Sequence, residues 1–320
     1  MKKALIFGIS GQDGSYLADI LLKNGYDVVG SSRDAQISTF KNLKLLNISN
    51  EIEKISVSIN DFRSVLQAVK THKPDEIYNL AGQSSVSLSF EQPVETLESI
   101  VIGNLNILES IRFTDSAAKY YNAGSSEIFG NCEEKVNETT AFNPKSPYGV
   151  SKATAFWHVR NYREAYDLFA CTGVLFNHES PLRPEHFVTA KIIKSVCRIA
   201  NGKQEKLHLG NLDIWRDWGF APEYVFAMWR MLQQENPEDH VIATGLTMSL
   251  RDFVKFAFDY FNLNWNDYVE IDENLLRPSD IRKGFANTSK AKQKIDWEAN
   301  LKGEKLIEKL IDCELNSFQY

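Results

Sequence analysis

The stretch Ala4-Leu-Ile-Phe-Gly-Ile-Ser-Gly-Gln-Asp-Gly-Ser-Tyr-Leu17 indicates the fold class of this 320-residue chain. A short apolar run leads into Gly8, Gly11 and Gly14, and a helical spacing of apolar residues follows. A strand, a glycine turn and a helix in this order are typical of a βαβ unit whose turn binds the phosphates of a dinucleotide. The alternative is a purely structural turn, because the spacing is G-x-x-G-x-x-G rather than G-x-G-x-x-G.

The alternation of strand and helix continues to residue 176. Buried strands are predicted at 27–33, 54–59, 76–81, 119–123 and 169–176, and helices at 62–70, 94–113 and 149–166. This order indicates an α/β fold with a doubly wound parallel sheet of the Rossmann type. Ligands of such sheets bind beyond the carboxyl ends of the strands, and the residues that follow those ends here are Gly11, Ala81, Ser125 and Asn177.

After residue 176 the regular alternation stops, which predicts a smaller C-terminal lobe. Loops are expected at 177–184 and 216–222, and helices at 187–200 and 223–234. We expect residues 1–176 to form the dinucleotide-binding domain, with segments near 210–240 and 284–298 returning to it. The remainder of 177–320 is expected to form mainly a substrate-binding lobe.

Composition narrows the class of protein. The 36 basic and 42 acidic residues give a net charge of −6, which argues against a nucleic-acid or anionic-membrane surface. The four cysteines are far apart and the six histidines lack metal-ligand spacing, so we expect reduced thiols and no metal site. No stretch approaches the ~20 apolar residues needed to span a bilayer. These features predict a cytoplasmic enzyme.

Four polar residues predict the chemistry. Tyr148 and Lys152 are four apart on a predicted helix, where the ammonium is expected to favour the ionised phenol. Ser125 and Glu127 are two apart on what reads as extended chain, so both are expected to face one pocket. The Tyr-x-x-x-Lys spacing is common by chance, and it indicates a catalytic site here only because Ser125 and Glu127 accompany it. A base, a hydroxyl and a carboxylate suit proton and hydride chemistry on a hydroxylated substrate.

The end of the second strand suggests the type of dinucleotide. Ser31, Ser32 and Arg33 stand where a protein that binds NAD usually has a carboxylate for the ribose hydroxyls. A cation there favours a 2′-phosphate and therefore NADP, and the alternative is a solvated surface arginine. Asn60 and Asp61 end the next strand, in a position that suits the adenine amino group.

The chain resembles the extended short-chain dehydrogenase/reductases that modify nucleotide sugars, and most closely the GDP-mannose 4,6-dehydratases. The resemblance runs along nearly the whole sequence, and the stretch around Phe176 to Pro181 is its most specific part. The motifs that carry it are Gly8-Ile-Ser-Gly-Gln-Asp-Gly-Ser-Tyr-Leu17, Tyr78-Asn-Leu-Ala-Gly-Gln-Ser84, Ser125-Ser-Glu-Ile-Phe-Gly130, Ser146-Pro-Tyr-Gly-Val-Ser-Lys152, Leu175-Phe-Asn-His-Glu-Ser-Pro181 and Arg216-Asp-Trp-Gly-Phe220.

The resemblance implies a mechanism. Tyr148, helped by Lys152 and Ser125, takes the proton of the sugar's carbon-four hydroxyl while NADP+ accepts the hydride. Glu127 then removes the carbon-five proton, water leaves from carbon six, and the hydride returns to carbon six. A carbonyl reductase needs no second base, so Glu127 separates a dehydratase from a reductase.

The resemblance also implies which residues bind the two ligands. Besides Tyr148 and Lys152, the expected cofactor-binding residues are Gly8, Ser10, Gly11, Gln12, Asp13, Gly14, Arg33, Asn60, Asp61, Leu80, Ala81, Gln83, Leu175, Asn177, His178 and Arg183. The expected residues for the GDP-sugar are Ser84, Ser85, Ser126, Glu127, Asn177, Val188, Lys191, Gly210, Arg216, Arg277 and Asp280.

Other functions remain open at this stage. One is a reductase or epimerase of a 4-keto-sugar nucleotide on the same fold, and another is a dehydratase for a different GDP-sugar such as a GDP-heptose. A third is a non-catalytic sensor of dinucleotides, which the four polar residues argue against. The family's arginine-rich segment, which reaches a neighbouring subunit, retains only Arg33 here. We therefore expect a homodimer or homotetramer, with the dimer as the minimum.

Overall fold

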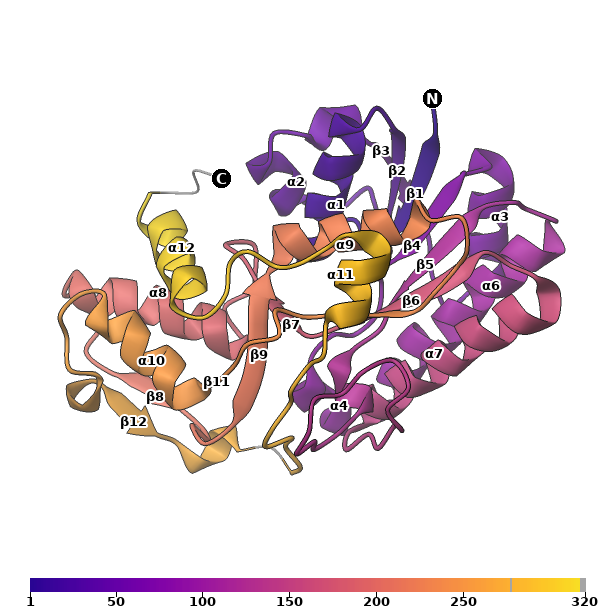
Figure 1. Ribbon diagram of the computed structural model, residues 1–320. Coiled ribbons are helices and arrows are strands. Elements are labelled where there is room, and N and C mark those ends of the chain that lie inside the picture. Colours follow the sequence, from indigo (N-terminus) through magenta and orange to yellow (C-terminus); the bar gives the residue numbers. More distant parts are fainter. Residues whose placement is uncertain (277, 317–320) are drawn as a thin grey trace.

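The computed structural model describes residues 1–276 and 278–316, so the predicted substrate-binding residue Arg277 lies outside the described residues. A seven-stranded parallel sheet forms the centre of the larger lobe, in the order β10-β6-β5-β4-β1-β2-β3 (Figure 1). This order confirms the predicted doubly wound α/β fold. The strands are β1 (Lys3–Phe7), β2 (Asp27–Ser32), β3 (Glu53–Ser56), β4 (Glu76–Asn79), β5 (Lys119–Ala123), β6 (Ala170–Leu175) and β10 (His240–Ile242).

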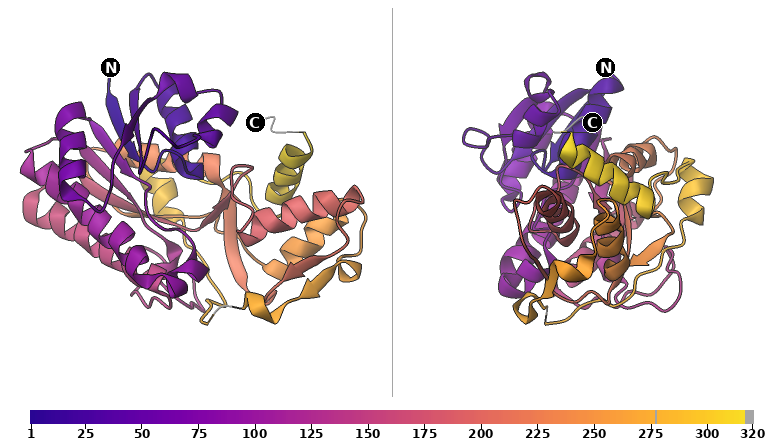
Figure 2. Two further views of the ribbon diagram at one scale, coloured as in Figure 1. Left: turned by 180° about the vertical axis from the view of Figure 1, so that it is seen from behind. Right: turned by 90° about the vertical axis from the view of Figure 1, so that its left-hand side faces the viewer.

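Helices cover both faces of this sheet (Figure 2). One face packs against α1 (Gln12–Lys23), α9 (Ala221–Leu232) and α11 (Ser289–Ile295), through residues such as Ile6 and Tyr121. The other packs against α3 (Phe62–His72), α6 (Gly103–Phe113) and α7 (Pro147–Tyr166), through the adjacent residues Leu5 and Tyr120. Successive strand residues point to opposite faces and both faces are buried, which explains why these strands are apolar throughout.

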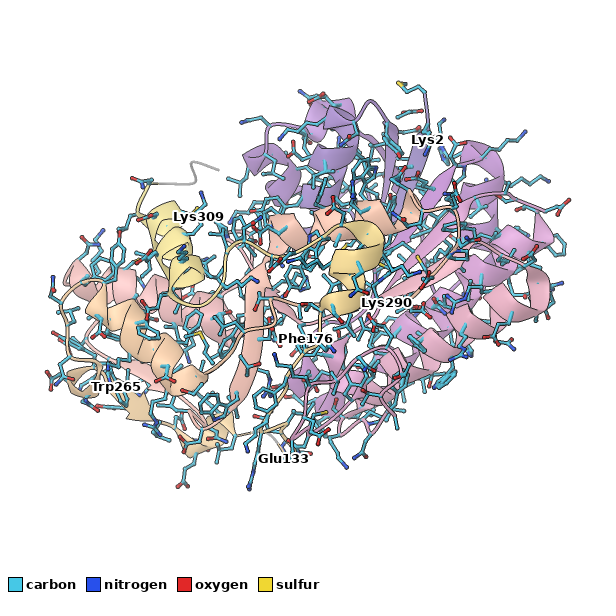
Figure 3. All side chains as sticks on the ribbon, in the orientation of Figure 1. Lys2, Glu133, Phe176, Trp265, Lys290 and Lys309 are labelled. Carbon is cyan, nitrogen blue, oxygen red and sulfur yellow. The ribbon has the colours of Figure 1, made fainter. Side chains whose placement is uncertain are left out.

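The smaller lobe lies beside the sheet and has its own apolar core (Figures 1 and 2). Its helices are α8 (Val188–Ala200), α10 (Leu250–Asp259) and α12 (Glu304–Leu315). Its strands are β7 (Asn177–Glu179), β8 (Leu207–Leu209), β9 (Trp215–Phe220), β11 (Thr247–Ser249) and β12 (Val269–Ile271). They form a three-stranded sheet, β11-β9-β7, and a pair, β12-β8. Buried Phe176 follows β6, and Figure 3 labels it in the middle of the molecule.

Two predicted loops contain strands instead. The prediction of loops at 177–184 and 216–222 was wrong, because β7 and β9 pair there in parallel. Their polar residues are buried with specific partners. The guanidinium of Arg216 donates to Asp280 at 3.0 Å, and the Asp217 carboxylate accepts from the amide and hydroxyl of Thr244 at 2.9 and 2.8 Å. These tertiary partners satisfy groups that otherwise favour a solvated loop.

The remaining elements are short. The predicted helix at 94–113 is three consecutive helical segments, α5 (Pro93–Leu97), a π-helical turn (Glu98–Ile102) and α6. The others are α2 (Lys41–Leu45), α4 (Val86–Glu91) and the 3₁₀ turns Ser49–Glu51, Ser126–Ile128, Trp265–Asp267 and Glu273–Leu275. Within the described residues, no helix is both long and apolar enough to cross a membrane, and no cluster of acidic, histidine or cysteine side chains is arranged to hold a metal ion.

Candidate active site

The carboxyl ends of the central strands bring the predicted site residues to one edge of the sheet. β6, β5, β4 and β1 are parallel neighbours, so the residues that follow Leu175, Ala123, Asn79 and Phe7 share that edge. The sequence-based expectation for these four strand ends is therefore confirmed. This edge of a doubly wound sheet is where ligands bind.

The glycine loop after β1 fits a diphosphate. Gly8 has φ +89°, and a Cβ there would lie 2.8 Å from the carbonyl carbon of Leu80. A Cβ on Gly14 would lie 2.3 Å from the carbonyl oxygen of Gly8, so the tight turn between β1 and α1 requires glycine at both positions. No side chain caps the N-terminus of α1. Its first-turn N–H groups can therefore donate to an anion, and the helix dipole favours one there.

The start of α7 places Tyr148 beside the residues that follow β5. Ser146 caps the helix, since its hydroxyl accepts from the amide of Gly149 at 3.0 Å, and Pro147 is the first helical residue. A Cβ on Gly149 would lie 2.9 Å from the carbonyl oxygen of Glu127. Glycine at this position thus lets the helix approach the turn that bears Glu127.

The phenol of Tyr148 has an environment that differs from the prediction. Burial raises the pKa of Tyr148 to about 12, against a hydrogen bond with Ser125 that lowers it, and the nearby Glu127 charge raises it further. The ammonium of Lys152 lies 5.7 Å from the Tyr148 ring centroid and donates to the carbonyl of Ala123 at 2.7 Å. Burial also lowers the pKa of Lys152 to about 8. The net shift of the Tyr148 pKa is opposite to the expected one, because desolvation is its largest cause and the groups that lower the pKa are Ser125 and Arg183 rather than Lys152.

Ser125 and Glu127 lie close to Tyr148 for a different reason from the predicted one. Ser126–Ile128 is a 3₁₀ turn rather than extended chain, and the Ser125 hydroxyl caps it by accepting from the amide of Glu127 at 3.3 Å. Ser126 and Glu127 line a pocket together with Arg216 of β9. The pocket therefore lies between the turn that bears Glu127 and the smaller lobe. Its other lining residues are Phe129, Gly130, Cys132, Val136, Phe176, Ile281 and Gly284.

Sequence reasoning did not single out Cys132, Ile281 or Gly284 as residues of this pocket. They come from the loop after the Ser126–Ile128 turn and from the segment after Asp280, which are about 150 positions apart in the chain. Hydrogen bonds join these two segments, such as the one from the Arg282 amide to the Asn131 side chain at 2.5 Å. No local spacing signals such a pairing.

A polar network ties the glycine loop to β7. Asp13 lies 2.9 Å from Nε2 of His178, and the Gln12 side chain donates to Asp13 at 3.0 Å and to the carbonyl of His178 at 3.2 Å. The Ser180 hydroxyl donates to Gln12 at 2.7 Å. The guanidinium of Arg183 lies 3.6 Å from the ring centroid of Phe187 and 3.4 Å from the Glu179 carboxylate. Four residues predicted for the cofactor thus meet at this edge.

The remaining predicted cofactor residues lie at the ends of other strands. Arg33 directly follows β2, and its side chain is 86% exposed and 3.5 Å from Glu95. Asn60 is exposed, and the Asp61 carboxylate caps α3 by accepting from the amides of Arg63 and Ser64 at 3.2 and 3.1 Å. Gln83 donates to the carbonyl of Ser85 at 2.7 Å. Ser10 and Gly11 belong to the glycine loop, Leu80 and Ala81 follow β4, and Leu175 and Asn177 border the β6–β7 junction.

The predicted substrate residues fall into two groups. Ser84 is exposed after β4, and Ser85 caps α4 by accepting from the amide of Leu88 at 3.3 Å. The others belong to the smaller lobe. Lys191 of α8 donates to the carbonyl of His208 at 2.6 Å, and Arg216 pairs with Asp280 at 3.0 Å. Val188 begins α8, and Gly210 follows β8 where a Cβ would lie 3.0 Å from the Leu275 carbonyl oxygen.

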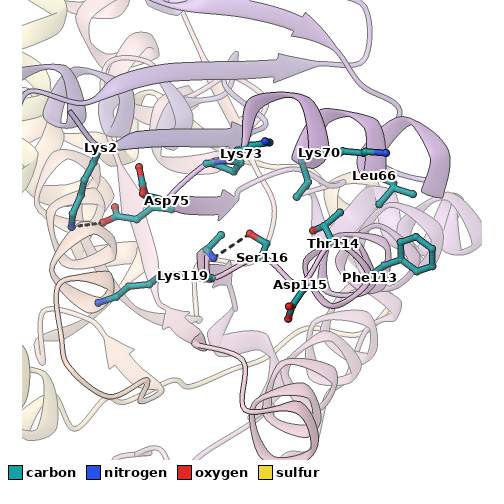
Figure 4. A pocket seen from close by; sticks show the side chains of 15 residues that line it. Lys2, Leu66, Lys70, Lys73, Asp75, Phe113, Thr114, Asp115, Ser116 and Lys119 are labelled. Carbon is teal, nitrogen blue, oxygen red and sulfur yellow. Dashed lines mark hydrogen bonds and ion pairs between the residues drawn. The ribbon is translucent and has the colours of Figure 1, made fainter.

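A second and larger pocket lies at the opposite edge of the sheet (Figure 4). It opens beside the amino ends of β4 and β5 and the C-terminal ends of α3 and α6, and Leu66, Lys70 and Phe113 are among its lining residues. It contains none of the predicted catalytic residues. Lysines at such helix ends have a simple structural role, because they interact favourably with the helix dipole.

Comparisons with known proteins identify the family of this chain. The sequence pattern of the family described as GDP-mannose 4,6 dehydratase matches residues 5–310. GDP-mannose 4,6 dehydratase 2 of Arabidopsis thaliana is 45% identical over 324 aligned positions, which cover 98% of this chain and 87% of that protein.

Two solved structures share the fold over nearly the whole chain. The dTDP-glucose 4,6-dehydratase of Bacillus anthracis in complex with NAD has a TM-score of 0.85 at 19% identity, covering 99% of this chain and 97% of that one. RMD from Pseudomonas aeruginosa complexed with NADPH has a TM-score of 0.82 at 19% identity, covering 99% of each. These two structures show the fold, and the pattern match and the plant relative show that the chain belongs to the GDP-mannose 4,6-dehydratase family.

Proposed function

We propose that this protein converts GDP-mannose to GDP-4-keto-6-deoxymannose by removing water, with a nicotinamide dinucleotide that is restored in each turnover. The observation that carries the proposal is the position of Ser125, Glu127, Tyr148 and Lys152 at the carboxyl edge of the sheet. Glu127 also lines a pocket that continues to Arg216 of the smaller lobe. Family membership supports the same reaction, and the relative from Arabidopsis thaliana has the matching name.

The four residues have separate roles in this proposal. Tyr148 takes the proton of the carbon-four hydroxyl, and Ser125 donates a hydrogen bond that favours the phenolate, as its contact lowers the pKa of Tyr148 against the effect of burial. Glu127 takes the proton from carbon five once carbon four is a ketone and passes it to the carbon-six hydroxyl, which leaves as water. The hydride then returns to carbon six, and carbon five is reprotonated with the proton that Tyr148 took. When bound, a nicotinamide would supply a hydride acceptor in its oxidised form and a hydride donor in its reduced form, and the positive charge of the oxidised ring would favour the phenolate.

Lys152 is proposed to hold the nicotinamide ribose. Its ammonium already donates to the carbonyl of Ala123 at the end of β5, which fixes its position one helical turn from Tyr148. Because an ammonium has three N–H groups, two remain for ribose hydroxyls. A ribose held in this way would lie beside the phenol rather than beside the outer surface of α7.

The function is tested by incubating the protein with GDP-mannose and a catalytic amount of NADP+, without a reductant. We expect a keto product lighter than the substrate by one water, detected by mass spectrometry, and no net formation of NADPH. Turnover only with NADPH and a 4-keto sugar nucleotide would favour the reductase instead. A parallel incubation with a GDP-heptose compares the two candidate sugars.

We propose NADP rather than NAD as the cofactor, on the basis of Arg33. The two solved structures described above hold NAD and NADPH respectively, so the fold alone does not choose between them. The exposed guanidinium of Arg33, at the carboxyl end of β2, can leave its 3.5 Å contact with Glu95 at little cost. A 2′-phosphate would gain a charge-assisted hydrogen bond from it.

Replacing Arg33 by alanine is expected to raise the Kd for NADPH by about ten- to a hundredfold, since a hydrogen bond to a charged group contributes ~1.5–3 kcal/mol. The Kd for NADH should change little, because NADH has no 2′-phosphate. Fluorescence titration measures both values, and Arg63→Ala is a matched control, because Arg63 is an exposed arginine of α3. An equal loss for NADH and NADPH would contradict the assignment.

We also propose that residues 1–176, with the segments near 210–240 and 284–298, bind the dinucleotide, while the rest of 177–320 binds mainly the GDP-sugar. Packing supports the return of these segments, because α9 and α11 lie against the sheet on the same face as α1. The pocket shared by Glu127 and Arg216 then lies where the two ligands meet.

A homodimer is proposed as the minimal assembly. The neighbouring helices α5 and α7 expose several large apolar side chains, with Val94 68%, Leu97 47%, Val150 50% and Trp157 51% accessible. Such a patch is typical of a contact between subunits. A second copy of the chain can cover it with the same patch, as in a two-fold symmetric dimer.

Replacing Trp157 by glutamate is expected to shift the protein towards monomer, because a charge then has to be desolvated in the contact. Sedimentation velocity measures the change, and Phe113→Glu serves as the control because Phe113 is 68% exposed outside this patch. An unchanged sedimentation coefficient for the Trp157 variant would place the contact elsewhere.

A further inference from the structure

Asp13 and His178 form a contact that the proposed reaction does not use directly. They are 165 residues apart in the chain, one in the first turn of α1 and the other in β7, and their Oδ2 and Nε2 atoms are 2.9 Å apart. The His178 side chain is 10% exposed and that of Asp13 is 21% exposed. The ring of His178 also stacks on Tyr224 of α9, with 4.7 Å between the ring centroids.

The geometry of His178 identifies its protonation state. Its Nδ1 is 2.7 Å from the carbonyl oxygen of Phe176, and its Nε2 faces the carboxylate of Asp13. A carbonyl oxygen and an ionised carboxylate only accept hydrogen bonds, so both ring nitrogens have to donate. A neutral imidazole has one N–H group, so beside an ionised Asp13, whose pKa is lowered, the ring has to be an imidazolium.

The electrostatic environment points the same way. Burial opposes charge on both groups, yet their mutual attraction keeps the pKa of His178 above and the pKa of Asp13 below their ordinary values. The Gln12 amide also donates to Asp13. The other charged or titratable groups that face the pair are Arg183 and Glu179 on the β7 side, Tyr148 and Lys152 of α7, Tyr121 of β5 and Tyr224 of α9.

The pair belongs to a set of contacts that all join the same two segments. Gln12 donates to the backbone carbonyl of His178 at 3.2 Å and accepts from the Ser180 hydroxyl at 2.7 Å. The glycine loop and β7 are therefore held together by neutral hydrogen bonds and one ion pair. The loop provides the diphosphate site, and β7 follows the strand end that borders the catalytic edge.

We propose that Asp13 and His178 are positioning residues, which form an ionised pair that holds the glycine loop against β7 and so fixes both cofactor-binding segments next to Tyr148. The charge state of the pair is independent of the proposed function. Its effect on the cofactor rests on the proposed use of a nicotinamide dinucleotide.

The first test measures the protonation of His178 directly in the full-length protein. In long-range ¹H–¹⁵N spectra of histidine-labelled protein recorded over a pH series, we expect one ring to keep both nitrogens protonated at a pH where an ordinary histidine, with a pKa of 6.5, is already neutral. This signal should be absent from His178→Gln, and in Asp13→Asn the ring should become neutral because its counter-ion is lost. Neutral rings for all histidines of the wild type, or a charged His178 in Asp13→Asn, would overturn the proposal.

The second test measures the positioning effect without substrate turnover. We expect the Kd for NADPH, from fluorescence titration, to rise by about tenfold or more in both variants, as expected for the loss of a hydrogen bond between charged groups. In the wild type, affinity should be retained below the raised pKa of His178 and fall as pH rises through it, at the midpoint seen by NMR. The titration of Lys152 remains in His178→Gln and so is separated from that of His178.

His186→Gln is the matched control, because His186 is exposed nearby and outside the network. An unchanged Kd for NADPH in His178→Gln would contradict the positioning role. So would a wild-type Kd that stays constant across the pH range in which His178 loses its proton. Failure of the protein to dehydrate GDP-mannose, with the spectrum and the binding results as expected, would instead contradict only the proposed substrate.

Discussion

Replacing Glu127 by glutamine is expected to lower the rate of dehydration by about 10²- to 10⁴-fold, the usual contribution of a general base. Glutamine has nearly the same shape but does not accept a proton at neutral pH. The oxidation at carbon four does not require this carboxylate, so it should persist in the variant. We therefore expect the Glu127 variant to bind NADPH normally and to retain the first half of the reaction.

Two measurements separate these steps. Proton exchange at carbon five, followed by NMR in D₂O, should disappear together with product formation, whereas stopped-flow absorbance should still show transient reduction of the cofactor. Glu133→Gln is a suitable control, since Glu133 lies six residues later with a side chain 81% exposed. A Glu127 variant that dehydrates at the wild-type rate would remove the distinction between dehydratase and reductase on which the proposed function depends.

Replacing Tyr148 by phenylalanine is expected to lower kcat by a similar 10²- to 10⁴-fold, through loss of the base for the carbon-four hydroxyl. Here both halves of the reaction should be lost, including transient reduction of the cofactor. In the wild type the deprotonated phenol is the active form, so kcat/KM should increase with pH towards the pKa of Tyr148. Burial raises this pKa to about 12 without ligands, and a bound nicotinamide cation lowers it.

The pH profile and a control variant test this role. The increase with pH should be absent in the Tyr148 variant, and Tyr166→Phe at the 49% exposed end of the same helix should behave as wild type. Preserved cofactor reduction in Tyr148→Phe would show that another group takes the hydroxyl proton. Dinucleotide binding without turnover, in the wild type as in the variant, would favour the interpretation of the protein as a dinucleotide sensor.

The features of the larger lobe that are local in sequence could be predicted. The Gly8, Gly11 and Gly14 spacing and the apolar runs on both sides of it indicated a βαβ unit. Strands and helices can be recognised in this way because the spacing of apolar residues over a short stretch differs between the two. Parallel neighbours share a carboxyl edge, so the gathering of Gly11, Ala81, Ser125 and Asn177 followed from the fold class.

The smaller lobe was harder to predict, because its strands depend on distant partners. Arg216 and Asp217 look like loop residues until Asp280 and Thr244 satisfy them in the folded chain. The same applies to the contact between Asp13 and His178, which has no counterpart in local spacing. Long-range polar contacts of this kind are decided by packing rather than by propensity.

The pKa of Tyr148 could not be predicted from the spacing of residues in the sequence. The four-residue interval to Lys152 correctly suggests proximity, and the two side chains do lie on one face of α7. The interval contains no information on burial, however, and burial is the first cause of the raised pKa of Tyr148. The ammonium instead donates to Ala123, a backbone partner that sequence spacing does not show.

The central claim is that one pocket carries out oxidation at carbon four and elimination across carbons five and six without consuming its cofactor. GDP-mannose labelled with deuterium at carbon four tests it most directly, with ²H NMR of the product and mass spectrometry of the dinucleotide. We predict that the deuterium is found at carbon six of a 4-keto-6-deoxy product and that the dinucleotide remains unlabelled. Deuterium accumulating in reduced dinucleotide, with the carbon-six hydroxyl retained, would contradict the account.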